Sequence, residues 1–60
     1  METGHFVVTV DTAGNRFEDE WPSSDRAEFH YRNRVGCARA WSYRLVEWWS
    51  NGALVEAYTA

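Results

Sequence analysis

The stretch WSYRLVEWWSNGALVEAY, residues 41–58, decides the fold of this chain. It contains two runs that are rich in β-branched and aromatic residues, and Asn51-Gly52 lies between them. A type I′ turn needs positive φ at both of its central residues, and Asn-Gly adopts that conformation readily. The sequence therefore predicts a β-hairpin over residues 41–59.

Both faces of this hairpin are expected to be apolar. A two-residue loop sets Trp49 opposite Leu54 on one face and Trp48 opposite Val55 on the other. A sheet with one solvated face should be polar on that side. We therefore expect one face to be covered by a second copy of the chain or by another protein. The same register pairs Leu45 with Tyr58, Tyr43 with Ala60, and Val46 with Ala57.

A second hairpin is expected over residues 5–21, after a frayed start at residues 1–4. The run HFVVTV is β-branched and predicts a strand, and the run RFEDEW beyond the turn alternates polar and apolar residues. A four-residue loop, Thr12–Asn15, would set Val10 opposite Phe17. One face would then hold Phe6, Val8, Val10, Phe17 and Trp21, with Asp19 as the exception.

A helix is expected between the hairpins, over residues 23–39. Ser23 or Ser24 is the expected N-cap, because a serine hydroxyl accepts a hydrogen bond from the first free N–H groups of a helix. Gly36 can end the helix, or it can lie inside a helix that runs to Ala40, and the sequence leaves both alternatives open. The stripe expected to face the sheet consists of Ala27, Tyr31, Val35 and Ala38.

The element order β-β-α-β-β predicts an α+β fold in a single domain, residues 1–60. Its simplest arrangement is a four-stranded, mainly antiparallel sheet with one helix packed on one face. A single helix covers a single face, so the other face of the sheet becomes the expected place of function.

Sixty residues make a small domain, and 17% of them are aromatic. A chain of this length buries only about 60% of the surface that its unfolded form exposes. Small domains often gain stability from disulfides, a metal ion or a second subunit. Cys37 is the single cysteine, so an internal disulfide is excluded. We therefore expect a homodimer.

The formal net charge of −3 argues against general binding to duplex DNA, because that affinity comes mainly from neutralising phosphates with Lys and Arg. The charges are unevenly placed. Residues 26–44 carry five Arg and one acid, whereas residues 1–25 carry six acids and one Arg. The basic segment can form a local patch or pair with the acidic hairpin, and we favour pairing.

The basic residues other than the two His are all Arg, which is typical of a GC-rich genome. Together with the small size, this usage suits an accessory protein of an actinobacterium or its phage. No apolar run approaches the ~20 residues that span a bilayer, and a single thiol suits a reducing compartment. We therefore expect a cytoplasmic protein without a membrane partner.

No residue pattern predicts catalysis, a cofactor or a metal site. His5, His30 and Cys37 lack the paired spacing that zinc sites use. About 10 Å of helix rise would separate His30 from Cys37, which is too far for a nucleophile and its base. Adjacent carboxylates such as Glu18 and Glu20 on an exposed strand typically protect a sheet edge. We therefore expect no enzymatic activity.

The expected function is that of an interaction protein that self-associates through an aromatic-rich sheet face or edge and binds or inhibits a protein partner. Trp, Tyr and Arg are the residues most enriched at such interfaces. The alternative is a small nucleotide or single-stranded nucleic-acid binder, in which Arg holds phosphate and Trp or Tyr stacks on bases. The expected interface residues are Trp41, Tyr43, Trp48, Trp49, Leu54, Tyr58 and Phe29, and the candidate contacts to phosphate or to an acidic partner are Arg32, Arg39 and Arg44.

Overall fold

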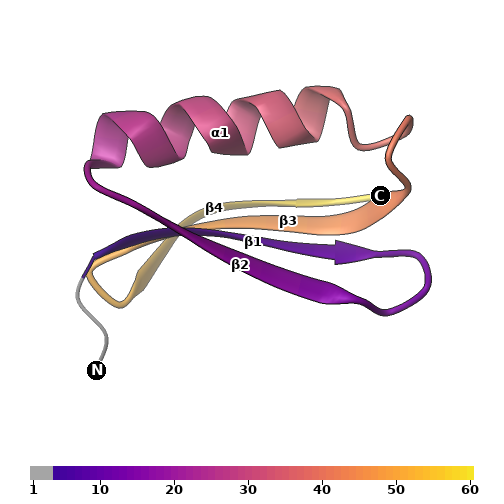
Figure 1. The fold of residues 1–60 in the computed structure, drawn as a ribbon, viewed down its shortest axis with the longest axis horizontal. Helices are drawn as coiled ribbons and strands as arrows, with labels where there is room; N and C mark the ends of the chain where they lie inside the picture. Colours follow the sequence, from indigo (N-terminus) through magenta and orange to yellow (C-terminus); the bar gives the residue numbers. More distant parts are fainter. Residues whose placement is uncertain (1–3) are drawn as a thin grey trace.

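The computed structural model describes residues 4–60 and confirms the predicted α+β fold (Figure 1). Two β-hairpins flank one helix, in the predicted order β-β-α-β-β. The expected fraying of residues 1–3 lies outside the described residues. The elements are β1 (His5–Asp11), β2 (Arg16–Trp21), α1 (Ser24–Gly36), β3 (Tyr43–Ser50) and β4 (Ala53–Thr59).

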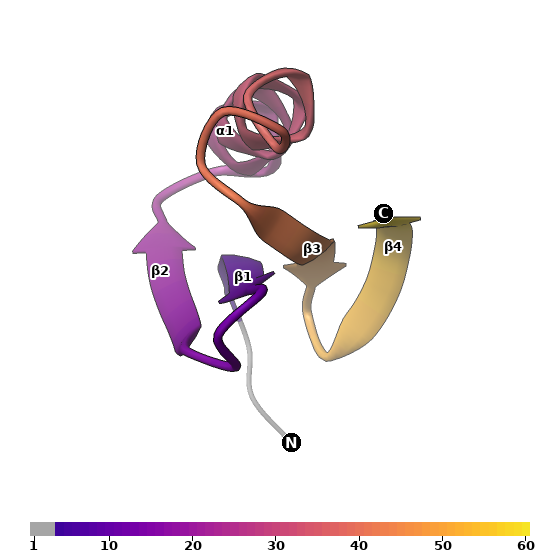
Figure 2. The ribbon, with the colours of Figure 1, turned by 90° about the vertical axis from the view of Figure 1, so that its right-hand side faces the viewer.

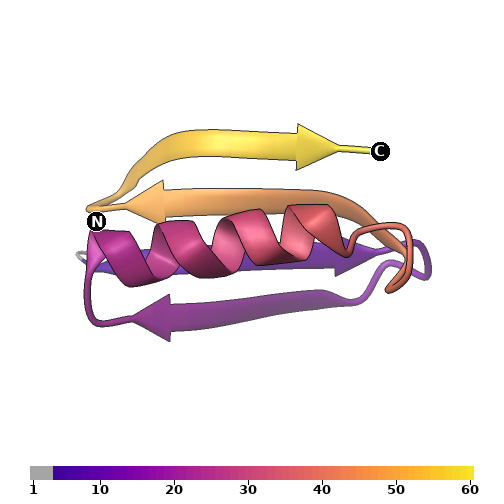
Figure 3. The ribbon, with the colours of Figure 1, turned by 90° about the horizontal axis from the view of Figure 1, so that it is seen from above.

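The four strands form one antiparallel sheet in the order β2-β1-β3-β4. The first strands of the two hairpins pair with each other in the middle, so β2 and β4 are the two edges. The helix packs on one face of the sheet only (Figure 2). Seen from above, α1 lies over the middle of the sheet, and β4 lies outside its cover (Figure 3). No helix among residues 4–60 is long and apolar enough to cross a membrane.

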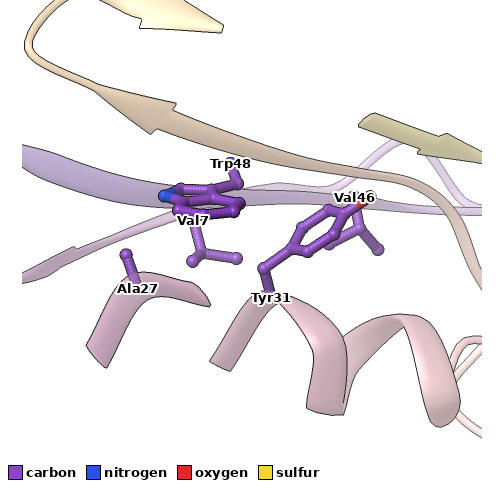
Figure 4. Close-up of a cluster of buried hydrophobic side chains, with 5 residues drawn as sticks. All are labelled: Val7, Ala27, Tyr31, Val46 and Trp48. Carbon is purple, nitrogen blue, oxygen red and sulfur yellow. The ribbon is translucent and has the colours of Figure 1, made fainter. Parts of the chain in front are cut away.

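The core lies between α1 and the two central strands. Val7, Val46 and Trp48 point from the sheet toward the helix, and Ala27 and Tyr31 point back toward them (Figure 4). All five are buried. The predicted helix stripe is confirmed for Ala27, Tyr31 and Val35, because Val35 packs against this cluster. Ala38 is also buried, but it lies beyond the end of the helix.

The helix is shorter than the expected 23–39. Ser23 is the N-cap, and its hydroxyl accepts a hydrogen bond from the Arg26 N–H at 3.2 Å. The helix ends at Gly36, which resolves the alternative that the sequence left open. Ala38 therefore lies in the connecting loop, where its carbonyl accepts a hydrogen bond from the Tyr43 N–H at 2.8 Å.

The register predicted for the first hairpin is wrong by one residue. Val10 lies opposite Arg16 rather than opposite Phe17. The backbone N–H of Asp11 bonds the Asn15 carbonyl at 3.0 Å, so the loop closes with three residues instead of four. Gly14, with φ of 90°, supplies the left-handed residue that a three-residue loop needs.

A one-residue slip moves every side chain of a strand to the other face. Phe17 and Trp21 therefore lie on the helix face, and they do not share a face with Phe6, Val8 and Val10 as predicted. Trp21 stacks on His30 of α1, with the ring centroids 3.6 Å apart.

Asp19 is no longer an exception on an apolar face. Its carboxylate lies 2.7 Å from Arg34 of the helix, in an ion pair whose geometry falls short of an aligned hydrogen bond. The face to which the slip moves Asp19 is therefore the face that offers it a counter-charge.

The second hairpin has the predicted turn and a different register beyond it. Asn51 and Gly52 have φ of 51° and 80°, as a type I′ turn requires, and Trp49 lies opposite Leu54 as predicted. Val55 is then an extra residue, because the next pair is Trp48 with Glu56. The other pairs shift by one, to Val46 with Tyr58, Leu45 with Thr59 and Arg44 with Ala60, which corrects the predicted pairing of Tyr43 with Ala60.

The start of the C-terminal hairpin differs from expectation, whereas its end at Thr59 agrees with it. β3 begins at Tyr43, so Trp41 lies in the loop before it. Arg44 is an extra residue opposite β1, because Tyr43 pairs with Asp11 while Leu45 pairs with Val10. This irregularity turns Tyr43 toward the helix side, where it packs against the core.

Gly4 belongs to the ordered structure rather than to the frayed start that was expected for residues 1–4. Its carbonyl accepts a hydrogen bond from the Asn51 N–H at 2.7 Å. Its N–H donates to the Asn51 side chain at 3.3 Å. The turn of the second hairpin therefore holds the residue before β1.

Candidate functional site

The face of the sheet opposite α1 is the candidate site, and we call it the open face. Directly opposed residues of antiparallel strands share a face, and Val7 and Trp48 point toward the helix. Their neighbours along each strand point the other way. The open face thus comprises Phe6, Val8 and Val10 of β1, Leu45, Glu47 and Trp49 of β3, Leu54, Ala57 and Thr59 of β4, and Arg16, Glu18 and Glu20 of β2.

Side chains of the open face shield its own centre. Val8 and Val10 are only 3% and 7% exposed, although no helix covers them. Leu54 is 47% exposed, and Trp49 is half-buried. The apolar surface that a partner could bury therefore lies on β3 and β4 and at half-buried Phe6 of β1.

Charged groups lie mainly on the β2 side of the open face. Arg16 and Glu18 form an exposed ion pair at 2.6 Å. Glu47 stands among the apolar residues, where it accepts a hydrogen bond from the Trp49 indole N–H at 3.2 Å. The open face therefore holds the three carboxylates of Glu18, Glu20 and Glu47 and the one guanidinium of Arg16. It is acidic along its β2 side and mainly apolar along the other side.

Trp49 and Leu54 are the two expected interface residues that lie on the open face. The assignment of Trp48 to the interface is corrected, because Trp48 faces the helix, is 7% exposed and belongs to the core. Tyr43 and Tyr58 also lie on the helix side, where they are half-buried against the same cluster.

Trp41 and Phe29 lie away from the open face. Trp41 is 54% exposed in the loop after the helix, and its ring meets Tyr43 edge-on at 5.8 Å. Ser42 next to it has φ of 58°, which is uncommon for a residue other than glycine. Phe29 is 63% exposed on α1 and meets His30 edge-on at 5.2 Å. The expected contact residues therefore occupy four places: the open face, the helix side of the sheet, the loop before β3, and α1.

The candidate phosphate contacts Arg32, Arg39 and Arg44 also differ in their surroundings. Arg32 is held by Glu28 at 3.0 Å and lies 3.6 Å from Glu56 of β4, and the Glu28 hydrogen bond raises the pKa of Arg32. Among residues 4–60, neither Arg39 nor Arg44 takes part in an ion pair. Within the basic segment, Arg34 pairs with Asp19 of the acidic hairpin, which is the kind of pairing that we favoured, whereas Arg32 pairs with Glu28 of the segment itself.

Within residues 4–60, no three His, Cys, Asp or Glu side chains gather closely enough to hold a metal ion. His30 stacks on Trp21, whereas the Cys37 thiol lies 3.7 Å from the Asn33 side-chain oxygen. The two candidate members of a nucleophilic dyad therefore have different neighbours.

Two acid–base groups have pKa values shifted by their surroundings. Hydrogen bonds from Asn15, and more weakly from Ala13, lower the pKa of Asp11 at the first turn. Burial raises the pKa of Tyr31, and the nearby Glu56 carboxylate raises it further. Both groups take part in the fold, because Asp11 caps a turn and Tyr31 lies in the core.

Sequence reasoning missed the contribution of β1 and β2 to the open face. The pattern Asp11-x-x-Gly14 could have revealed it, because Asp favours the first position of a type I turn and Gly favours its fourth. That pattern predicts a three-residue loop, which sets Arg16, Glu18 and Glu20 of β2 on the same face as Phe6, Val8 and Val10.

Comparisons with protein-family models, with curated proteins and with solved structures found no match.

Proposed function

We propose that this chain is a non-enzymatic interaction protein that forms a homodimer and binds, or inhibits, a protein partner through the open face. One observation carries the proposal: the single helix covers one face of the sheet, while the other presents Trp49 and Leu54 beside carboxylates. Aromatic side chains with a polar handle are favoured at protein interfaces, and Trp49 fits that description.

The charges on the open face indicate the chemistry of the partner. The carboxylates of Glu18, Glu20 and Glu47 outnumber the one guanidinium of Arg16 on this face. A partner with an apolar centre and Lys or Arg on one side would complement it. Because exposed charges are screened by salt, its affinity should fall as ionic strength rises.

The proposed location is the cytoplasm, on the ground of the lone thiol of Cys37. The proposed source, an actinobacterium or its phage, rests on the absence of lysine. Sequencing the neighbouring genes would test the source directly.

The experiment compares Trp49→Ala with Phe29→Ala, which removes an exposed aromatic from the opposite side of the molecule. We expect wild type and Phe29→Ala to bind the hydrophobic-patch dye 8-anilinonaphthalene-1-sulfonate, and Trp49→Ala to bind it weakly. Partner proteins captured by wild type should also be captured by Phe29→Ala and lost with Trp49→Ala.

Sedimentation at high micromolar concentration gives the independent test of self-association. A stable monomer that binds no dye would contradict the proposal. A partner captured equally by all three proteins would show that the open face does not bind it.

A second candidate function is suggested by the loop before β3. Trp41 is more than half exposed beside Tyr43, and Arg39 and Arg44 flank the pair in sequence. Exposed aromatic rings with cationic neighbours suit a nucleotide or single-stranded nucleic acid. Titration with oligonucleotides at low salt should then quench Trp fluorescence in wild type but not in Trp41→Ala. No quenching would end this alternative.

A further inference from the structure

The two edge strands, β2 and β4, differ in how well their side chains protect them against pairing with another strand. Four of the six residues of β2 are charged, which is a common means of preventing edge-to-edge pairing. β4 has seven residues and one charge, Glu56, and Arg32 of the helix lies 3.6 Å from that carboxylate. β4 is therefore the unprotected edge.

The hydrogen-bond pattern shows which backbone groups of β4 are free. The Ala60 N–H donates to the Arg44 carbonyl at 3.0 Å. Antiparallel pairs alternate between bonded and non-bonded positions, so Tyr58 and Glu56 also direct their backbone groups to β3. The N–H and C=O groups of Ala57 and Thr59 consequently point away from the sheet.

The irregularity at Val55 limits where another strand can pair. An extra residue disrupts the ladder and twists the edge, which discourages pairing there. The regular part of the edge therefore runs from Glu56 to Ala60. Within it, Ala57 and Thr59 supply four free groups on each copy.

We propose that β4 pairs antiparallel with β4 of a second copy, with Tyr58 on the two-fold axis. Ala57 of one protomer then bonds Thr59 of the other, and the reciprocal bonds form across the axis. A register with Glu56 on the axis would set like charges opposite each other. A register with Ala57 on the axis would bring Val55 into the pairing, where the ladder is irregular.

The Tyr58 register favours a second copy of the chain as the occupant. It sets Tyr58 beside Tyr58 of the partner protomer, and aromatic pairs of this kind stabilise antiparallel strands. It also leaves Ala57 and Thr59, which are small, on the open face. The two open faces become one continuous surface that is apolar across β4 and acidic at both outer β2 edges.

This inference rests on the homodimer of the proposed function and identifies its contact. Ala57→Pro tests it, because proline removes an N–H that makes no bond to β3. We expect wild type to sediment as a dimer and Ala57→Pro as a folded monomer, with a dimer dissociation constant raised about tenfold or more.

Glu18→Pro is the matched control in the sedimentation experiment. The Glu18 N–H also points away from the sheet, but at the opposite edge. The Glu18→Pro variant should remain a dimer. Loss of the dimer in both proline variants, or in neither, would overturn the inference.

Disulfide trapping tests the register without a proline. In a Cys37→Ser background, the double variant Ala57→Cys/Thr59→Cys should form a disulfide-linked dimer on mild oxidation, because directly opposed bonded residues have Cα atoms about 5.5 Å apart. Each single cysteine should cross-link far less. Efficient cross-linking of Ala57→Cys alone would overturn the Tyr58 register.

The outcomes also separate this inference from the proposed function. A dimer that survives Ala57→Pro and is lost in Trp49→Ala would place self-association on the open face and overturn the β4 contact. A monomeric wild type that still binds dye at Trp49 would overturn the β4 contact and leave partner binding in place.

Discussion

Trp48 and Trp49 are adjacent in the sequence and lie on opposite faces of the sheet. Trp48 is 7% exposed against the helix, and Trp49 is half-buried on the open face. The alternation of side chains along a strand separates them. Composition alone cannot say which of the two belongs to the core, because both are large, apolar rings with one N–H.

Truncation of these two residues should therefore have unequal effects. Trp48→Ala removes a core ring and should cost about 3–5 kcal/mol of unfolding free energy. Trp49→Ala should cost about 1–2 kcal/mol. A domain of 60 residues has a total stability of about 3–9 kcal/mol, so Trp48→Ala should lose roughly a third of it or more. Urea denaturation followed by circular dichroism measures both, and equal losses would contradict the assigned faces.

Asp11 predicts a pH dependence at the first turn. Its carboxylate accepts hydrogen bonds from the N–H groups of Ala13 and Asn15 and from the Asn15 side chain, at 3.0, 2.9 and 3.1 Å. These bonds hold its pKa below the ordinary value of 3.8. A lowered folded-state pKa gives stability that is present above pH 3.8 and is lost as the pH falls toward the folded-state value.

The carboxyl carbon of Asp11 followed by NMR should thus titrate below 3.8. Asp11→Asn should lose less stability than wild type when the pH falls from 5 to 2. A titration midpoint at or above 3.8 would contradict the turn geometry.

At the scale of the element, the length of one loop determines a whole face. The first hairpin closes with three residues, and this places Trp21 on His30 and Asp19 beside Arg34. A four-residue closure would have set both side chains on the face that the helix leaves open. Contacts with α1 and the turn geometry therefore favour the same register.

Substitution of Gly14 and of Gly36 by alanine should change the stability of the protein in opposite directions. Gly14 has φ of 90° and nothing within 4 Å of an added Cβ, so Gly14→Ala should cost about 1–2 kcal/mol through backbone strain alone. Gly36 ends the helix without positive φ and is equally unobstructed, so Gly36→Ala should gain roughly 0.5 kcal/mol. Thermal denaturation of both variants checks the signs, and a stabilising Gly14→Ala would contradict the three-residue loop.

At the scale of the whole molecule, a single helix packs against a sheet of four strands. It covers the centre of one face, leaves the open face uncovered, and leaves the outer side of β4 without a neighbouring strand. A second copy at β4 would widen the sheet without covering the open face. Self-association and partner binding can therefore coexist.

Dimer formation predicts that stability depends on protein concentration. Because dissociation accompanies unfolding, the melting temperature of wild type should rise as protein concentration increases from low to high micromolar. The melting temperature of Ala57→Pro should be independent of concentration. Differential scanning calorimetry provides the measurement, and a wild-type value that does not change with concentration would contradict the dimer.

The sequence by itself determined the fold class, the Asn51-Gly52 turn, the Ser23 cap region and the helix stripe. These depend on contacts between near neighbours, namely turn dihedrals, capping bonds and helical periodicity. They are confirmed by the structure.

Only the tertiary structure decided which residues face outward. Register depends on loop closure, on the extra residues at Arg44 and Val55, and on contacts between the helix and β2. A slip of one residue exchanges the two faces at little local cost, so the choice rests on long-range packing. For this reason the sequence could indicate an uncovered face, and the structure was needed to show that it holds Trp49 and not Trp48.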